Sequence, residues 1–134
     1  MNNQTARKEY YSNDIIDEAA SYLSTITNSP KLESEILLAD LLKKDRLDFY
    51  KRNISVDHIS YKKYQNLLLE RQKGKPLAYL TGKKEFWSLV LEVNEAVLIP
   101  RPETELLVEK CLSFIPKINN PNVLELGTGS GAIS

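Results

Sequence analysis

The chain has 134 residues, with eighteen Lys or Arg balanced by eighteen Asp or Glu, so its formal net charge is zero. A general nucleic-acid binder or a protein held on an anionic membrane needs a basic surface, which this balance does not supply. With 42% hydrophobic and 27% charged residues the chain is close to an average globular protein, which excludes disordered and collagen-like classes. We therefore expect a packed core, no direct nucleic-acid partner and no membrane partner.

Three further features bound the class of protein. The segment 1–17 is polar and charged, without the apolar core of a signal peptide, so we expect a cytoplasmic protein. Cys111 is the lone cysteine and cannot form an internal disulfide; its place in a predicted helix indicates an inert, buried thiol. His58 is the lone histidine, with no cysteine nearby, which predicts an exposed helical position and no metal site.

Apolar residues at helical spacing predict a small helical bundle over about residues 12–82. The first helix is expected to be capped by Ser12 or Asn13, and the second by Ser29, with Pro30 in its first turn. The expected buried stripes are Ile15, Ile16, Ala19, Tyr22, Leu23 and Ile26 in the first helix, Leu32, Ile36, Leu37, Leu41 and Leu42 in the second, and Ile59, Tyr64, Leu67 and Leu68 in a later one.

The same reasoning gives the rest of the bundle. Asp45 precedes a short third helix over about 46–52, and Ser55 or Asp57 begins a longer fourth helix. Gly74 is expected to end that helix in a left-handed conformation, and a last short turn runs from Pro76 to Leu80, closed by Gly82.

The pattern changes after Gly82. Two aromatic and β-branched runs, 86–93 and 97–99, flank Asn94 and Glu95, which predicts a β-hairpin with its turn at those two residues. Pro102 then begins another helix, with Glu103 and Glu105 at its positive end and apolar residues up to Ile115. After a loop, Asn122–Leu126 is predicted as a short strand.

A glycine-rich turn follows that strand and is the main candidate for a ligand site. Gly127, Gly129 and Gly131 let the backbone bend tightly and approach a ligand, while free amides of the following helix face a negative group. By spacing alone, Gly127 and Gly129 with Ala132 also fit a dinucleotide site. Glu125, two positions before the first glycine, shifts the interpretation: a Glu-x-Gly-x-Gly-x-Gly run resembles the first motif of S-adenosylmethionine-dependent methyltransferases.

Two other phrases are more diagnostic. Residues 75–89, Lys-Pro-Leu-Ala-Tyr-Leu-Thr-Gly-Lys-Lys-Glu-Phe-Trp-Ser-Leu, and 97–105, Val-Leu-Ile-Pro-Arg-Pro-Glu-Thr-Glu, are similar to the linker and entry region of the PrmC/HemK family of release-factor glutamine methyltransferases. The distance from these phrases to the glycine run and the leucine-rich helices before them match as well. The resemblance covers nearly the whole chain.

The resemblance implies an enzyme that transfers methyl from S-adenosylmethionine to the glutamine of the Gly-Gly-Gln tripeptide in bacterial class 1 peptide chain release factors. It implies three parts: a release-factor-binding helical bundle at 1–82, a β-hairpin linker at 83–100, and at 101–134 the first strand of a truncated Rossmann-like α/β domain. The cofactor site would use Glu125, Gly127, Thr128, Gly129, Ser130 and Gly131, with Arg101 and Glu103 approaching it.

The chain lacks two features that the resemblance implies: a substrate motif, and an acidic residue at the end of a second strand that would bind the cofactor ribose. The Asn-Pro-Pro-Tyr motif that orients the substrate amide in such enzymes is absent, since the Asn120-Pro121 step continues into Asn122. No catalytic residue is therefore assigned, and we expect a truncated, inactive chain whose tail after about residue 116 is disordered or aggregation-prone. A non-catalytic helical binding module and the remnant of a decayed gene are the alternatives.

Several of these residues also have a plain structural interpretation. Arg101 and Glu103 fit the start of a helix as well as a cofactor site. Phe86 and Trp87 are expected to pack the hairpin more than to contact substrate. Tyrosines are common anchors of protein interfaces. The candidates in the helical part are Tyr10, Tyr11, Tyr61 and Tyr64.

Overall fold

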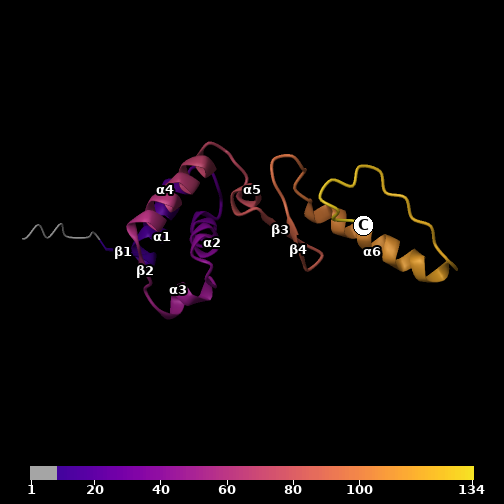
Figure 1. Cartoon of the computed structure of the whole chain (residues 1–134), viewed down its shortest axis with the longest axis horizontal. Helices are drawn as coiled ribbons and strands as arrows, with labels where there is room; N and C mark the ends of the chain where they lie inside the picture. The colour runs from indigo at the N-terminus through magenta and orange to yellow at the C-terminus, as the bar shows by residue number, and fades with distance from the viewer. Residues whose placement is uncertain (1–8) are drawn as a thin grey trace, which may run out of the picture. The chain divides into compact units, whose positions relative to one another are not determined.

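The computed structural model describes residues 9–134 and divides into two compact units, one ending at Thr81 and one beginning at Gly82 (Figure 1). The first unit is helical, as the sequence predicts. Its elements are β1 (Tyr10–Tyr11), α1 (Ser12–Leu23), α2 (Pro30–Leu42), α3 (Leu47–Lys51), β2 (Ser55–Val56), α4 (His58–Gln72) and α5 (Leu77–Thr81). β1 and β2 form a short antiparallel ladder that ties the start of the unit to the segment before α4.

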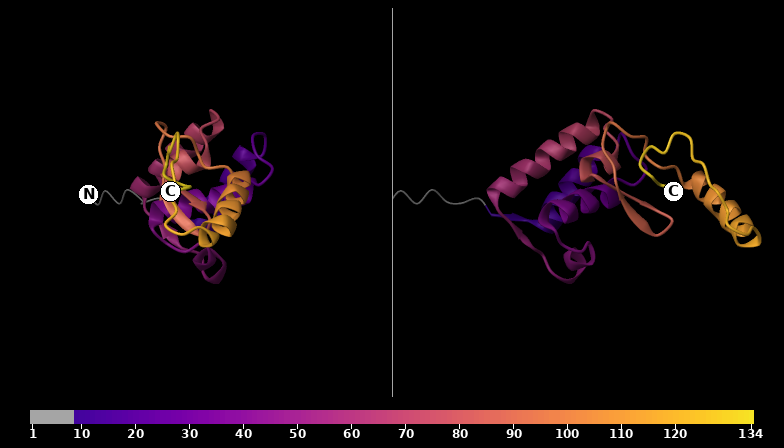
Figure 2. Two further views of the ribbon diagram at one scale, coloured as in Figure 1. Left: turned by 90° about the vertical axis from the view of Figure 1, so that its right-hand side faces the viewer. Right: turned by 45° about the vertical axis from the view of Figure 1, so that its right-hand side comes forward.

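The core of this unit lies among α1, α2 and α4, which contact one another pairwise and run side by side in Figures 1 and 2. Burial of apolar side chains between these helices is the main favourable term for folding. The buried apolar residues are Ile15, Ile16, Ala19, Leu23, Leu37, Leu38, Ala39, Phe49, Val56, Tyr64 and Leu68.

The predicted stripes were correct in most positions and wrong in three. Leu32 is 41% exposed and Ile59 is 68% exposed. Ile59 lies five residues before buried Tyr64, which places it about 140° away around a helix of 3.6 residues per turn. Leu32 lies in the first turn of α2. Tyr22 is 38% exposed.

The helix starts show which capping predictions hold. Asp57 caps α4, because its carboxylate accepts hydrogen bonds from the amides of Ile59 at 2.9 Å and Ser60 at 3.0 Å. Ser29 lies at the predicted start of α2, but its side chain makes no capping bond, and Ser55 lies in β2. Gly74, just after α4, has the predicted left-handed φ of 98°.

The predicted cap of α1 is wrong, because Ser12 is already the first helical residue and Tyr11 precedes it without a side-chain bond. Ser12 is fully buried, and its hydroxyl accepts from the Ile54 amide at 2.9 Å and donates to Asn53 Oδ1 at 3.2 Å. The same Asn53 oxygen accepts from the Asn13 amide at 3.0 Å. An amide of the first turn of α1 is therefore satisfied by a residue forty positions away.

Tyr64 joins two helices inside the core. Its side chain is 1% exposed, and its hydroxyl donates a hydrogen bond to the Ser34 carbonyl oxygen at 3.0 Å. Burial raises the pKa of the Tyr64 phenol far above its ordinary value, so the group remains a neutral donor.

A second link between α2 and α4 is ionic. Arg71 donates to both oxygens of Glu33, at 2.7 Å from Nε and 3.2 Å from Nη2, and Thr27 donates to the same carboxylate at 2.8 Å. Burial would raise the pKa of Glu33, but the hydrogen bonds from Arg71 and Thr27 and the charge of Arg71 outweigh it and hold this pKa below 4.5.

The second unit contains a hairpin with a different turn from the predicted one. β3 (Lys83–Phe86) pairs with β4 (Leu89–Glu92) in antiparallel register, with Phe86 opposite Leu89. The two linking residues, Trp87 and Ser88, have φ of 51° and 60°, the left-handed pair of a two-residue turn whose twist matches that of the strands. Asn94 instead begins a later turn in which its carbonyl accepts from the Val97 amide, and residues 97–99 form no strand.

The helix predicted from Pro102 is present. It consists of η1 (Pro102–Thr104), α6 (Glu105–Phe114) and η2 (Ile115–Lys117). Its apolar residues Leu106, Leu107, Leu112 and Phe114 are at least half exposed, and Cys111 is also exposed, so the prediction of a buried thiol was wrong. A helix buries its apolar face only against another layer of secondary structure. Residues 118–134 form no helix or strand that could provide such a layer for α6.

The strand predicted at 122–126 is absent. Val123, Leu124 and Leu126 are 74%, 83% and 86% exposed. A strand needs a neighbour that satisfies its backbone groups, and no described segment pairs with these residues. The described part of the chain holds two two-stranded antiparallel sheets and no parallel sheet, so the Rossmann-like part stays a prediction. No described helix is both long and apolar enough to cross a bilayer.

We expect Tyr64→Phe to lower the free energy of unfolding by about 1 kcal/mol, because it removes a buried hydrogen bond and keeps the ring. Urea unfolding followed by circular dichroism measures the change. Tyr22→Phe is the matched control, since no hydrogen bond of the Tyr22 hydroxyl is found among the described residues. Equal stability of the two variants would contradict the role given to the Tyr64 hydroxyl.

We expect Glu33→Gln to flatten the acid side of the stability profile. A carboxyl whose folded pKa is lowered contributes stability above its unfolded pKa, near 4.5, and loses it as pH falls through the folded value. The wild-type chain should therefore lose more stability than Glu33→Gln between neutral pH and the acid range below 4.5. Unfolding curves at several pH values measure this, with Glu18→Gln as control; identical slopes in all three proteins would refute it.

Candidate functional site

The glycine run adopts a conformation that other residues adopt only with strain. Gly127, Gly129 and Gly131 have φ of 76°, 57° and 75°, and the Gly131 amide donates to the Thr128 carbonyl at 2.9 Å. A Cβ at any of the three would meet no heavy atom closer than 3.6 Å. The backbone conformation, and not crowding, therefore calls for glycine here. The helix expected after the turn is not formed in residues 132–134.

Glu125 has the polar feature that a ligand site requires. Its Oε2 atom is buried and has no hydrogen-bond partner, and it is the one side-chain atom of this kind in the part of the chain that the structure describes. An unsatisfied buried acceptor is costly, so it marks a place where a donor from a ligand would bind favourably. An amine or hydroxyl group has the matching chemistry.

Arg101 and Glu103 occupy a helix start, as their structural interpretation predicts. Arg101 precedes η1 with an extended backbone, Pro102 follows, and Glu103 lies in the first turn. Both side chains are exposed, and no hydrogen bond or ion pair between them and residues 125–131 is found within residues 9–134. The structure therefore gives these two residues a structural role and leaves their cofactor role a prediction.

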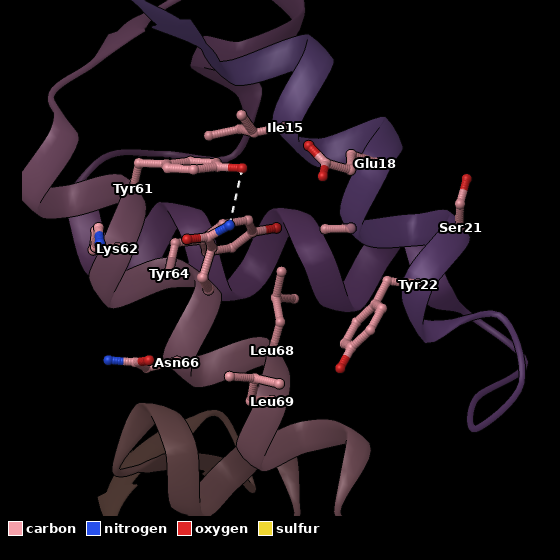
Figure 3. Close-up of a pocket in the computed structure, with 12 residues that line it drawn as sticks. Ile15, Glu18, Ser21, Tyr22, Tyr61, Lys62, Tyr64, Asn66, Leu68 and Leu69 are labelled. Carbon is pink, nitrogen blue, oxygen red and sulfur yellow. Dashed lines mark hydrogen bonds between the residues drawn. The ribbon is translucent and has the colours of Figure 1, made fainter. Parts of the chain in front are cut away.

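A cavity of the helical unit lies between α1 and α4 and has a volume of about 650 Å³ (Figure 3). We call it the α1–α4 groove. Its lining residues are Ile15, Glu18, Ala19, Ser21 and Tyr22 of α1 and Tyr61, Lys62, Tyr64, Gln65, Asn66, Leu68 and Leu69 of α4. The sequence did not predict this groove, because Tyr22 was expected in the buried stripe of the first helix and Leu69 was not singled out.

The predicted tyrosine anchors take different positions. Tyr64 is buried, so that prediction was wrong, whereas Tyr61 lines the groove and stacks on Tyr10 with ring centroids 3.8 Å apart. Tyr11 is exposed and donates to Glu9 at 2.6 Å. Tyr50, which was not predicted, is 66% exposed and donates to the buried Glu35 at 2.5 Å.

Phe86 and His58 agree with their structural interpretations, whereas Trp87 is 36% exposed and the packing expected of its side chain is not found. Phe86 is buried at 1% exposure, and Trp87 occupies the turn with its amide donating to Glu105 Oε1 at 3.0 Å. His58 is exposed at the start of α4, with Nδ1 3.3 Å from the Tyr10 hydroxyl. No group of three potential metal ligands occurs among residues 9–134.

Comparison with known proteins adds relatives over most of the chain. A release factor glutamine methyltransferase of Coxiella burnetii is 45% identical over 113 residues, which are 84% of this chain and 41% of the relative. Relatives with the same name from Leptospira interrogans and Salmonella typhimurium are 50% and 42% identical over 107 and 109 residues. These alignments cover 78% and 81% of this chain and 37% and 39% of the relatives. The chain thus spans about two fifths of the length of these relatives.

The family model described as the PrmC N-terminal domain matches residues 14–82, and these include all of the α1–α4 groove. The match covers 69 of 134 residues, just over half of the chain. The chain therefore belongs to the PrmC N-terminal domain family.

Proposed function

We propose that this chain is the amino-terminal part of an S-adenosylmethionine-dependent methyltransferase that modifies a glutamine of class 1 peptide chain release factors. The observation that carries the proposal is the extent of the similarity. A relative named release factor glutamine methyltransferase from Buchnera aphidicola of Schizaphis graminum aligns over 120 residues, 89% of this chain. The unit that ends at Thr81 holds at most 81 residues, so the similarity extends into the second unit.

The residues of the second unit fit the cofactor. Three glycines in left-handed conformations give a backbone turn open to a ligand, and Glu125 brings a buried carboxylate oxygen without a partner. We propose that Glu125 accepts a hydrogen bond from the cofactor's amine or hydroxyl groups, and that Gly127, Thr128, Gly129, Ser130 and Gly131 line it with backbone. Bound S-adenosylmethionine supplies a methyl group on a positively charged sulfur. Arg101 and Glu103 are proposed to stand at the entry to this site.

The substrate side of the reaction needs residues that these 134 positions do not contain. An amide nitrogen is a poor nucleophile, and holding it in place beside the methyl group is worth about 7–11 kcal/mol of the barrier. The Asn-Pro-Pro-Tyr motif that would hold the glutamine amide does not occur in the sequence. We propose that the 134-residue chain alone does not transfer methyl, and that the reaction requires the part the relatives have in addition.

A non-catalytic binding module is the second candidate. It is favoured by the helical unit, which closes a core of eleven buried apolar residues and carries the α1–α4 groove. In that case the chain would bind a release factor without a role in methyl transfer. The cytoplasmic location stays a prediction in either case.

We expect methyl transfer to appear when the chain is extended with the carboxy-terminal remainder of the Coxiella burnetii relative. Incorporation of radiolabelled methyl from S-adenosylmethionine into a class 1 release factor measures it. A release factor with alanine in place of the Gly-Gly-Gln glutamine is the control and should remain unlabelled. Labelling by the 134-residue chain alone would contradict the proposed need for the missing part, and an inactive, folded chimera would favour the binding module.

We expect Glu125→Gln in the same chimera to raise the Kd for S-adenosylmethionine by about 10–100-fold, because a hydrogen bond to a charged group is lost. Isothermal titration calorimetry measures the Kd. Glu109→Gln, an exposed carboxylate on α6, is the matched control and should leave the Kd unchanged. Equal affinity of both variants would remove Glu125 from the cofactor site.

A further inference from the structure

The α1–α4 groove has a floor of buried, mostly apolar side chains and is open to solvent above them. Ala19, Tyr64 and Leu68 at its floor are 1%, 1% and 7% exposed, and they belong to the core. Ile15 and Tyr61 lie at one end and Tyr22 and Leu69 at the other (Figure 3). Tyr22 is 38% exposed and Leu69 is 48% exposed, so the two side chains at that end still present apolar surface to solvent. Covering such surface is favourable for a partner.

The wall on the α4 side is held in place before any partner binds. The Tyr61 ring stacks on Tyr10 at 3.8 Å, and the Gln65 amide nitrogen donates to the Tyr61 hydroxyl at 3.1 Å, drawn as a dashed line in Figure 3. A pre-organised wall lowers the entropy lost on association. The groove is therefore a formed surface whose shape does not depend on an occupant.

Two charges on the groove have no partner within the described chain. Glu18 on α1 and Lys62 on α4 make no hydrogen bond or ion pair among residues 9–134, although Lys31 and Asp17 nearby on α2 and α1 are paired at 3.1 Å. Burial of the Tyr61 ring is the largest cause that raises the pKa of its phenol, and the negative charge of Glu18 is the next largest. An occupant with a basic residue opposite Glu18 and an acidic residue opposite Lys62 would complement both.

The length of the groove limits the size of its occupant. Its lining spans residues 15–22 of α1 and 61–69 of α4, which at 1.5 Å per residue is about 10–12 Å, or two turns of helix. Apolar anchors three or four positions apart on a partner helix would then reach the floor and the Tyr22–Leu69 end.

We propose that the α1–α4 groove docks a short amphipathic helix of the release factor, with apolar anchors on the floor and oppositely charged residues against Glu18 and Lys62. The inference rests on the proposed function and deepens it, since it assigns the hold on the protein substrate to a surface separate from the glycine loop. The groove would add affinity for the substrate protein.

The test is isothermal titration of the 134-residue chain with a bacterial class 1 release factor. Tyr22→Asp and Leu69→Asp should each weaken binding about tenfold or more, because they place a charge against the partner's apolar anchors. Ile59→Asp and Leu32→Asp introduce the same charge at exposed apolar positions of α4 and α2 outside the groove, and they should leave the Kd unchanged. Circular dichroism shows that each variant is folded.

Glu18→Lys and Lys62→Glu give a second, surface-only measurement that does not touch the core. Each should weaken binding by about threefold, and the effect should shrink at high salt. If the release factor binds and all four groove variants match the wild type, the groove is not the docking site, while the proposed methyltransferase function stands. If the wild-type chain does not bind the release factor, the groove proposal fails as well, and methyl transfer by the chimera still decides the proposed function.

Discussion

The helical unit depends on one buried tyrosine. Tyr64 fills the space between α1, α2 and α4, and its hydroxyl must find an acceptor because an unsatisfied buried hydroxyl is costly. The Ser34 carbonyl at 3.0 Å meets that need and fixes α4 against α2. The other face of the same side chain belongs to the floor of the α1–α4 groove. The interaction that closes the core therefore also determines the shape of the surface to which we assign partner binding.

Polar bonds between distant residues hold the ends of the bundle. At one end Ser12 bonds to Asn53 and Ile54, and at the other Glu33 bonds to Arg71 and Thr27. Both clusters are at least partly buried, and every one of these hydrogen bonds is shorter than 3.3 Å. The polar groups of both clusters therefore have the hydrogen-bond partners that partly buried groups require. These bonds fix where α1 begins and how the end of α4 meets the start of α2, which orients the two walls of the groove.

Structural features that depend on residues close together in the sequence were predicted, and features that depend on contacts between distant residues were missed. Asp57 caps α4 and Pro30 opens α2 because each acts within its own first turn. Ser12 carried the same local signal, but bonds to Asn53 and Ile54 take its hydroxyl. The hairpin was predicted, but its turn was misplaced, since Trp87 and Ser88 are not residues typical of a left-handed pair. The spacing of the glycines located the glycine run. The groove depends on how α1 packs beside α4, and no pattern within either helix predicts that packing.

The two proposed sites differ in what their own unit supplies. The groove belongs to a unit that closes a core of eleven buried apolar residues and in which no buried side-chain polar atom of the described residues lacks a hydrogen-bond partner. The glycine loop belongs to a unit in which Leu107, Leu124 and Leu126 are exposed and the Glu125 oxygen lacks a partner. A cofactor held there would need further layers of structure for burial and for positioning, because apolar faces and strands are stable only against neighbours. The release-factor binding that we propose therefore requires only residues of the helical unit, whereas the proposed cofactor binding requires the extended protein.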